Sequence, residues 1–131
     1  MSKTIITYGT FSFLHHGHIR LLRKAKKMGD YLIVGLSTDN FNKIKGKTCL
    51  QTYKQRKEVL EGIKYIDKII PEKNWSQKAK DIKKYKAQMV MGSDWEDKFD
   101  EYGCIYLPRT KGISTTILRK CYEIQGIKIS T

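Results

Sequence analysis

Two histidines three positions apart, His15 and His18, are the residues of this sequence best suited to chemistry on a phosphate. They stand where a helix is predicted to begin, so both imidazoles fall on one helix face. The free amide groups of a helix N-terminus suit an anion, and Gly17 lets the backbone approach it closely. Imidazole N–H groups there can donate to oxygens that gain charge in phosphoryl-type transfer. We therefore predict a phosphate site at this turn.

The histidine pair has two alternative interpretations, a metal site and a purely structural role. Histidines at this spacing can ligate a metal. However, His16 is the only other histidine in the chain, and no cysteine lies near the run. We expect the ring of His16 to point away from the other two. The pattern favours the phosphate site and assigns no metal ligand.

A second anion site is predicted at residues 109–116, which follow the last predicted strand and open the last predicted helix. Arg109 offers a guanidinium fork, and Ile113, Ser114 and Thr115 place amides and hydroxyls at the helix start. The structural alternative is a helix that Ser114 simply caps. Two anion sites at two helix starts predict that a long polyanion, such as a triphosphate, lies between them.

Basic side chains supply a third group of candidates. Arg56 lies four positions before Leu60 and seven before Ile63. It therefore falls on the apolar side of a predicted helix, with its head group at the edge of the sheet. Lys64 lies one position past that face and can join it. The segment before this helix carries three lysines, Lys43, Lys45 and Lys47. Its alternative interpretation is a solvated loop.

A carboxylate and an indole follow a predicted strand at Gly92, Asp94 and Trp95. The indole can stack on a nucleoside base, and the carboxylate can accept hydrogen bonds from an amine or a ribose hydroxyl. A turn with a packed tryptophan is the structural alternative. The segment is therefore a candidate nucleoside site.

Strand-like and helix-like segments alternate along the chain, which predicts a parallel sheet covered by helices. In such sheets, ligands bind at the carboxyl ends of the strands, where the candidate residues lie. The predicted strands are 4–8, 31–36, 68–70 before Pro71, 88–92 and 105–107. The predicted helices are 18–28, one that begins at Thr52, one over 76–85 and one from Ser114 to about residue 123.

Caps and apolar positions fix the register of these helices. Thr52 forms a capping box with Gln55, and Ser76 is predicted to cap the helix that follows it. The residues predicted to face the sheet are Ile19, Leu22, Ala25 and Met28 in the first helix, Val59, Leu60 and Ile63 in the second, and Ala79 and Ile82 in the third.

Length and composition limit the class of protein. The 131 residues suit one domain, and 40% hydrophobic with 30% charged residues is ordinary for a globular protein. With neither a signal peptide nor an apolar run near the ~20 residues of a membrane span, we expect a cytoplasmic protein. Three separated cysteines predict reduced thiols. The net charge of +13 favours an anionic partner without selecting nucleic acid or nucleotide.

Taken together, these segments resemble the glycerol-3-phosphate cytidylyltransferase family, within the wider His-x-Gly-His nucleotidyltransferase superfamily. The His-x-Gly-His motif at 15–18 indicates the superfamily, whereas Pro-Glu-Lys-Asn-Trp at 71–75 and Arg-Thr-x-Gly-Ile-Ser-Thr-Thr at 109–116 are more specific. The resemblance implies a Rossmann-like α/β fold of the nucleotidyltransferase type. A parallel sheet would carry helices on both faces, in a single domain over 1–131.

The resemblance implies transfer of a cytidylyl group from CTP to sn-glycerol 3-phosphate, giving CDP-glycerol and pyrophosphate. It also implies Mg²⁺, a homodimer, no nucleic-acid partner, no membrane insertion, and a place in teichoic-acid or capsular-polymer precursor synthesis. The implied catalytic residues are His15, His18, Lys45 and Arg109. The implied nucleotide-binding residues are Gly9, Thr10, Phe11, Gly17, Lys47, Gly92, Asp94, Trp95, Ile113, Ser114 and Thr115, and the implied acceptor-binding residues are Arg56, Lys64 and Trp75.

The sequence departs from the family pattern at three places. Ser12 stands where the family usually has an aspartate near the histidines, and Lys64 stands where an arginine is usual. Lysine cannot reproduce a bidentate phosphate contact. The segment between Phe99 and Cys104 is a few residues shorter than usual, which we expect only to trim a surface loop.

Two other functions stay open on the sequence. One is a cytidylyltransferase for another phosphorylated alcohol, such as phosphoethanolamine, phosphocholine or a polyol phosphate. The other is a non-catalytic nucleotide or nucleic-acid binder, which predicts steeply salt-dependent affinity for DNA or RNA and no pyrophosphate release.

Overall fold

A computed structural model describes residues 2–108 and 110–111 of the chain. Its β-branched and apolar segments pair with one another through their backbones, as buried parallel strands do. Within the described residues, five parallel strands form a sheet in the order β3-β2-β1-β4-β5. The strands are β1 (Thr4–Gly9), β2 (Tyr31–Ser37), β3 (Lys68–Glu72), β4 (Ala87–Gly92) and β5 (Ile105–Leu107).

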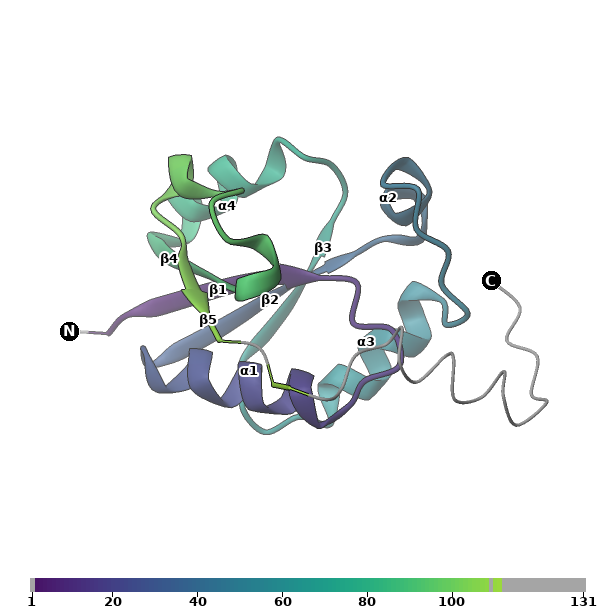
Figure 1. Ribbon diagram of the computed structural model, residues 1–131, viewed down its shortest axis with the longest axis horizontal. Helices are drawn as coiled ribbons and strands as arrows, with labels where there is room; N and C mark the ends of the chain where they lie inside the picture. Colours follow the sequence, from purple (N-terminus) through teal and green to yellow (C-terminus); the bar gives the residue numbers. More distant parts are fainter. Residues whose placement is uncertain (1, 109, 112–131) are drawn as a thin grey trace.

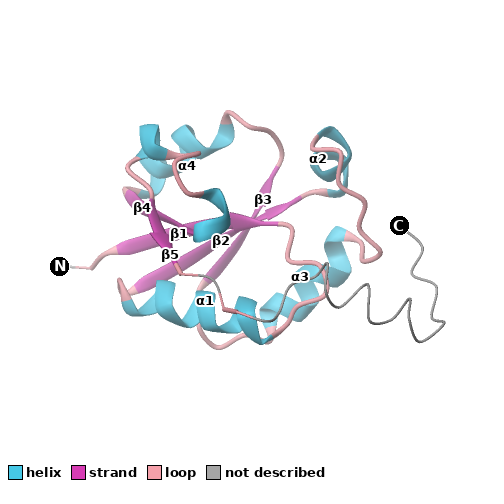
Figure 2. Ribbon diagram, in the orientation of Figure 1, coloured by secondary structure: helices cyan, strands magenta, loops and turns pink. Residues whose placement is uncertain are grey.

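Helices cover both faces of this sheet (Figure 1; Figure 2). On one face lie α1 (His16–Lys27) and α3 (Tyr53–Glu61), and on the other lies α4 (Gln77–Tyr85). The short α2 (Asp39–Ile44) directly follows β2, and two 3₁₀ turns at Ser93–Trp95 and Asp100–Tyr102 connect β4 to β5. The predicted α/β fold, with a parallel sheet between two helical layers, is confirmed.

The core lies in two layers, one on each side of the sheet. Successive strand residues point to opposite faces, so Ile5 packs in the layer below α1 and α3 while Ile6 packs in the layer below α4. Leu22 and Leu60 fill the first layer, as predicted, and both are fully buried. No helix in residues 2–108 is long and apolar enough to cross a bilayer, and Cys49 and Cys104 are free thiols.

The lysine-rich segment after β2 begins in a helix: α2 contains Lys43 and ends at Ile44, Lys45 caps its C-terminus, and Lys47 follows outside it. Thr38 caps α2 by accepting a hydrogen bond from the backbone N–H of Phe41 at 3.1 Å. Phe41 and Asn42 are buried in it. Because six residues with a single buried apolar side chain show no helical period, the pattern could not indicate this helix.

The third strand continues through Pro71 to Glu72, beyond the predicted end. Pro71 pairs in register with Leu36 of β2. The prediction failed because proline is tolerated where β3 actually lies, at the edge of the sheet.

Two helices face the sheet differently from the prediction. Val59 is 42% exposed and Ala79 is also exposed. In α4, Ile82 packs against the core as predicted, but the buried positions beside it are Lys78 and Asp81, because Glu72 beneath the helix gives Lys78 a buried partner. Ser76 makes no capping hydrogen bond, and its hydroxyl donates to Asn74 Oδ1 at 2.8 Å.

Candidate active site

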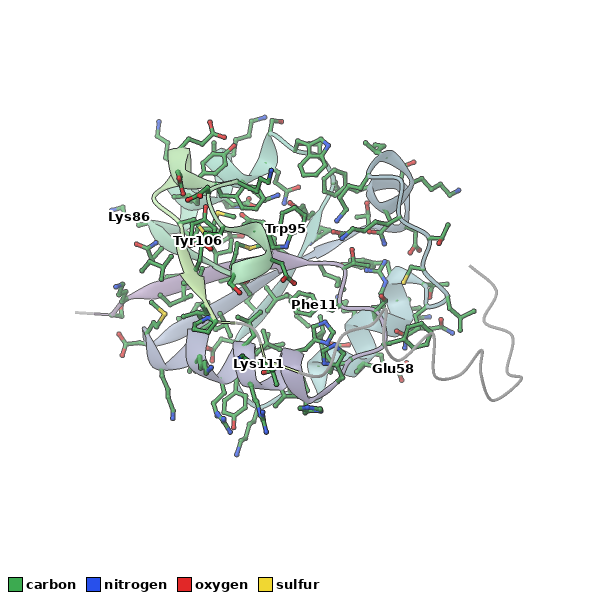
Figure 3. The ribbon with its side chains drawn as sticks, in the orientation of Figure 1. Phe11, Glu58, Lys86, Trp95, Tyr106 and Lys111 are labelled. Carbon is green, nitrogen blue, oxygen red and sulfur yellow. The ribbon has the colours of Figure 1, made fainter. Side chains whose placement is uncertain are left out.

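A cavity of about 510 Å³ opens at the carboxyl ends of β1, β3 and β4. Parallel α/β sheets bind ligands at this edge. Phe11 from the loop after β1 and Trp95 from the 3₁₀ turn after β4, both labelled in Figure 3, lie near it. The predicted site residues that line the cavity are Gly9, Thr10, Phe11, His18, Lys45, Lys47, Trp75, Gly92, Asp94 and Trp95.

The two predicted histidines cap the start of α1 reciprocally. His15 Nδ1 accepts from the backbone N–H of Gly17 at 3.1 Å, and His18 Nδ1 accepts from the backbone N–H of His15 at 3.1 Å. The ring centroids are 3.9 Å apart. Since a neutral imidazole that accepts at Nδ1 carries its proton on Nε2, both rings are fixed as Nε2–H donors.

Burial keeps His18 neutral. It lowers the pKa of His18 to about 4, with a further contribution from the neighbouring His15. His18 is therefore a neutral hydrogen-bond donor at physiological pH. His16 is exposed and does not line the cavity, as predicted.

The loop between β1 and α1 is shaped by left-handed backbone. Phe11 and Phe13 have φ angles of 51° and 48°, a conformation that non-glycine residues seldom adopt. The Phe11 ring tucks under Gly9, where an added Cβ would lie 2.8 Å from it, and stands 5.6 Å from the His18 ring. The glycine that ends β1 thus leaves room for the Phe11 ring beside the imidazole of His18.

Lys45 is held at the mouth of the cavity by hydroxyl groups. Its Nζ donates to Ser37 Oγ at 2.7 Å and to Thr10 Oγ1 at 3.4 Å, and it lies 4.8 Å from the centre of the Phe41 ring. Burial, and then the nearby charge of Lys47, lower the pKa of Lys45 to about 8, while Glu72 opposes the shift. Lys45 therefore carries a charge that titrates close to physiological pH.

Lys47 and the segment after β4 form the opposite wall. Lys47 Nζ lies 5.5 Å from the centre of the Trp95 ring. Asp94 precedes this ring in the 3₁₀ turn and also lines the cavity. A cation, an indole and a carboxylate therefore meet here, which fits a nucleoside with a phosphate attached.

Arg56 lies on the apolar side of α3 and reaches the sheet edge, as predicted. It is fully buried. Its guanidinium donates to the carbonyl oxygens of Thr10 and Ser37 at 2.8 Å and to Asp39 Oδ1 at 2.9 Å. These bonds tie α3 to the segments that follow β1 and β2, and Arg56 does not line the cavity.

Other predicted site residues lie elsewhere. Lys64 is exposed and rests on the ring of Tyr65, so it does not join the face of Arg56. Gly17 serves α1 through its backbone and is not part of the cavity wall. The predictions for Arg109, Ile113, Ser114 and Thr115 lie outside the described residues.

Residue-level reasoning missed an ion pair in the cavity wall. Lys78 Nζ pairs with Glu72 Oε2, and the two side chains are only 4% and 2% exposed. Ser37 Oγ donates to Glu72 Oε1 at 3.3 Å, which connects this pair to Lys45. The sequence carries no local signal for this pair, because charged residues on a helix normally indicate its solvated side.

Fold and site together define the class as an α/β nucleotide-transferring domain, in which imidazole and lysine side chains lie at the carboxyl edge of a parallel sheet. The cytidylyltransferase-like family model matches residues 6–121. The chain belongs to the cytidylyltransferase-like family.

Relatives and a solved structure agree with this family. The chain is 54% identical to the glycerol-3-phosphate cytidylyltransferase of Staphylococcus aureus, over 95% of this chain and 96% of that one. It is 52% identical to the Bacillus subtilis protein of the same name, over 95% and 99% of the two chains. The lipopolysaccharide core biosynthesis protein of Thermoplasma volcanium shares the fold, with a TM-score of 0.65 at 21% identity over 99% of this chain and 93% of that one.

Proposed function

We propose that this chain transfers a cytidylyl group from CTP to sn-glycerol 3-phosphate, giving CDP-glycerol and pyrophosphate. The observation that carries the proposal is the pair of imidazoles fixed as Nε2–H donors at a helix N-terminus, where His18 lines the cavity together with Lys45 and Lys47 while His15 stacks behind it. The two relatives described above, at 54% and 52% identity, carry the name of this activity.

The reaction is a displacement at the α-phosphorus of CTP. An oxygen of the acceptor phosphate forms the new P–O bond, and the bond from the α-phosphorus to the bridging oxygen breaks to release pyrophosphate. His15 and His18 donate through Nε2–H to oxygens that gain charge in the crowded transition state. No covalent enzyme intermediate is needed, since positioning and charge neutralisation supply most of the rate.

The lysines and the segments that follow the strands are proposed to bind the triphosphate, the nucleoside and the acceptor. Lys45 and Lys47 neutralise the triphosphate, and Asp94 and Trp95 hold the nucleoside. Trp75 lines the cavity and is proposed to bind the acceptor. Arg109, Ser114 and Thr115 are proposed to hold the outer phosphates. Arg56 is proposed to support acceptor binding through the loops that it ties together.

We propose that Mg²⁺ accompanies CTP. Residues 2–108 contain no cluster of three His, Cys, Asp or Glu side chains that could hold a metal. The carboxylates in the cavity wall are Asp94 and Glu72, and Glu72 is paired with Lys78. This donor set fits a cation held mainly by phosphate oxygens and water, with Asp94 as the protein carboxylate. We expect a chelator to abolish pyrophosphate release and added Mg²⁺ to restore it.

We further propose a cytoplasmic homodimer that supplies precursors of teichoic acid or a capsular polymer, as the family resemblance implies. The proposed ligands are CTP and a phosphorylated alcohol, without nucleic acid or membrane insertion. The position of the basic residues supports a small ligand, because Lys45 and Lys47 converge on one cavity at the strand ends.

The decisive experiment is pyrophosphate release from CTP, Mg²⁺ and glycerol 3-phosphate, with Ser12→Asp alongside. Ser12 lines the cavity next to Phe11, so an aspartate there restores the carboxylate usual in the family. We expect turnover by the chain as it stands. Turnover only in Ser12→Asp identifies an impaired member of the family. Silence in both variants, with turnover of another phosphorylated alcohol, contradicts the glycerol assignment.

A further inference from the structure

Lys78 sits in an aromatic cage made by the protein itself. Its Nζ lies 4.8 Å from the centre of the Tyr8 ring, 5.3 Å from Trp75 and 5.2 Å from Phe99. Aromatic faces at this range attract cations, and several rings around one ammonium group form the arrangement that proteins use to bind choline-like ligands. Here the bound cation belongs to the chain.

The cage is part of the cavity wall, and the side chain of Lys78 fills it. Lys78, Tyr8, Trp75, Phe99 and Glu72 all line the cavity. Tyr8 and Phe99 are 4% and 8% exposed, and the side chain of Lys78 is 4% exposed. The carboxylate of Glu72 completes the cage by pairing with Lys78. The ammonium group of Lys78 therefore already fills the space between the rings and already pairs with the carboxylate of Glu72, so a ligand in the cavity can use neither.

We propose that Lys78 determines acceptor specificity by occupying this cage, so that the site rejects phosphorylated alcohols that carry their own ammonium group. This inference rests on the proposed function, because it concerns which acceptor receives the cytidylyl group. An acceptor such as phosphocholine brings a cation next to Lys78, and of the three cage rings only Trp75, which is 50% exposed, has surface outside the cage. The phosphate of an uncharged polyol brings no cation to Lys78 and meets no such repulsion. Discrimination of this kind acts against the wrong ligand and needs no new contact with the right one.

The first test uses the unmodified protein and two ligands of matched shape. Phosphocholine and its carbon analogue, 3,3-dimethylbutyl phosphate, differ only in the charged nitrogen. Each is measured as an inhibitor of glycerol 3-phosphate turnover. We expect the neutral analogue to inhibit at a concentration at least ten times lower than phosphocholine. Equal inhibition by the two ligands, or stronger inhibition by phosphocholine, overturns the proposal.

The second test opens the cage. Lys78→Ala removes the internal cation and leaves Glu72 with the three rings, whereas Lys78→Met removes the charge but still fills the space. Both variants leave Glu72 without its ion pair, so a difference in ligand binding between them reports only on the empty space left by Lys78. We expect tetramethylammonium, followed by tryptophan fluorescence, to bind Lys78→Ala at least tenfold more tightly than Lys78→Met or the unmodified protein. Equal binding by folded samples of all three contradicts the cage.

Turnover links the cage to specificity. In Lys78→Ala we expect the ratio of kcat/KM for phosphocholine to kcat/KM for glycerol 3-phosphate to rise at least tenfold, with no such rise in Lys78→Met. An unchanged ratio in a Lys78→Ala variant that binds tetramethylammonium overturns the specificity role. Failure of the proposed function is distinct, because it is seen as absence of pyrophosphate release by the unmodified protein, while tetramethylammonium binding still reports on the cage.

Discussion

At the scale of single residues, the Nδ1 atoms of His15 and His18 each accept from a backbone N–H, so these two residues can act on a ligand only through Nε2. His18→Gln keeps an acceptor for the backbone N–H of His15, as glutamine does in a capping box. The change replaces the rigid imidazole Nε2–H by the N–H₂ of a longer, flexible amide that is not held in the same position, so we expect kcat to fall roughly 10²–10³-fold. Pyrophosphate release measures this, with exposed His16→Gln as a control near full activity. A loss of less than tenfold contradicts the role.

The same variant reports on stability at low pH. His18 has a pKa of about 4 in the folded chain, against about 6.5 when unfolded. Between these values the unfolded chain binds more protons. The contribution of neutral His18 to the stability of the folded chain is therefore complete above about pH 6.5 and is lost as the pH falls toward 4. We expect the unfolding free energy to drop by up to about 3 kcal/mol more in the unmodified chain than in His18→Gln. Urea unfolding across this range measures the difference, and parallel curves contradict it.

Lys45 sets the alkaline side of activity. Its pKa of about 8 follows first from burial and then from Lys47. A neutral Lys45 no longer balances the triphosphate, so we expect kcat/KM for CTP to fall as the pH rises through about 8. Lys45→Arg keeps its charge throughout this range, so its profile should stay flat there. Identical alkaline limbs in both proteins contradict the assignment to Lys45.

At the scale of elements, Arg56 joins α3 to the ends of β1 and β2, and no lysine can make the same set of bonds. We expect Arg56→Lys to lower the free energy of unfolding by about 2–3 kcal/mol, since buried carbonyl oxygens lose charged donors. Asp39→Asn is the matched control, because asparagine keeps an oxygen that can accept from Arg56 or from the backbone N–H of Tyr53 while the buried carbonyl oxygens keep their charged donor; we expect a smaller loss. Chemical denaturation compares the two variants. An equal loss of unfolding free energy in both contradicts the role of the Arg56 guanidinium.

The sequence predicts most of these elements because their signals are local. Buried strands such as Thr4–Gly9 are continuous apolar runs, and the Thr52 capping box needs only two residues at the right spacing. The histidine site is predictable for the same reason. Arg56 could also be placed, because its spacing to Leu60 puts it on the buried side of a helix.

Elements that depend on distant partners could not be predicted this way. Lys78 faces inward because Glu72, from a strand end, lies beneath it. Asp81 is buried because the hydroxyl of Tyr8 donates to it at 2.9 Å. Charged residues on a helix normally indicate its solvated side, so Ala79 was the natural choice for the inner face. Only the three-dimensional pairing reverses that preference.

At the scale of the whole molecule, the net charge of +13 should attract CTP over long range. Salt screens such attraction, since the Debye length falls to about 10 Å at 0.1 M. We expect kcat/KM for CTP to fall roughly tenfold between about 20 and about 200 mM KCl, with little change in kcat. Steady-state kinetics over this range measures it. A kcat/KM that does not respond to salt means that the charge serves something other than substrate capture.

The proline inside β3 bears on how copies of this chain meet one another. A sheet edge with unpaired N–H and C=O groups invites a strand from another molecule. β3 forms one edge of the sheet, and Pro71 has no backbone N–H to offer an incoming strand. Lys68, which is exposed at the start of the same strand, adds a charge that repels an identical edge. The edge is therefore built against strand-to-strand aggregation, and replacing Pro71 removes part of that protection.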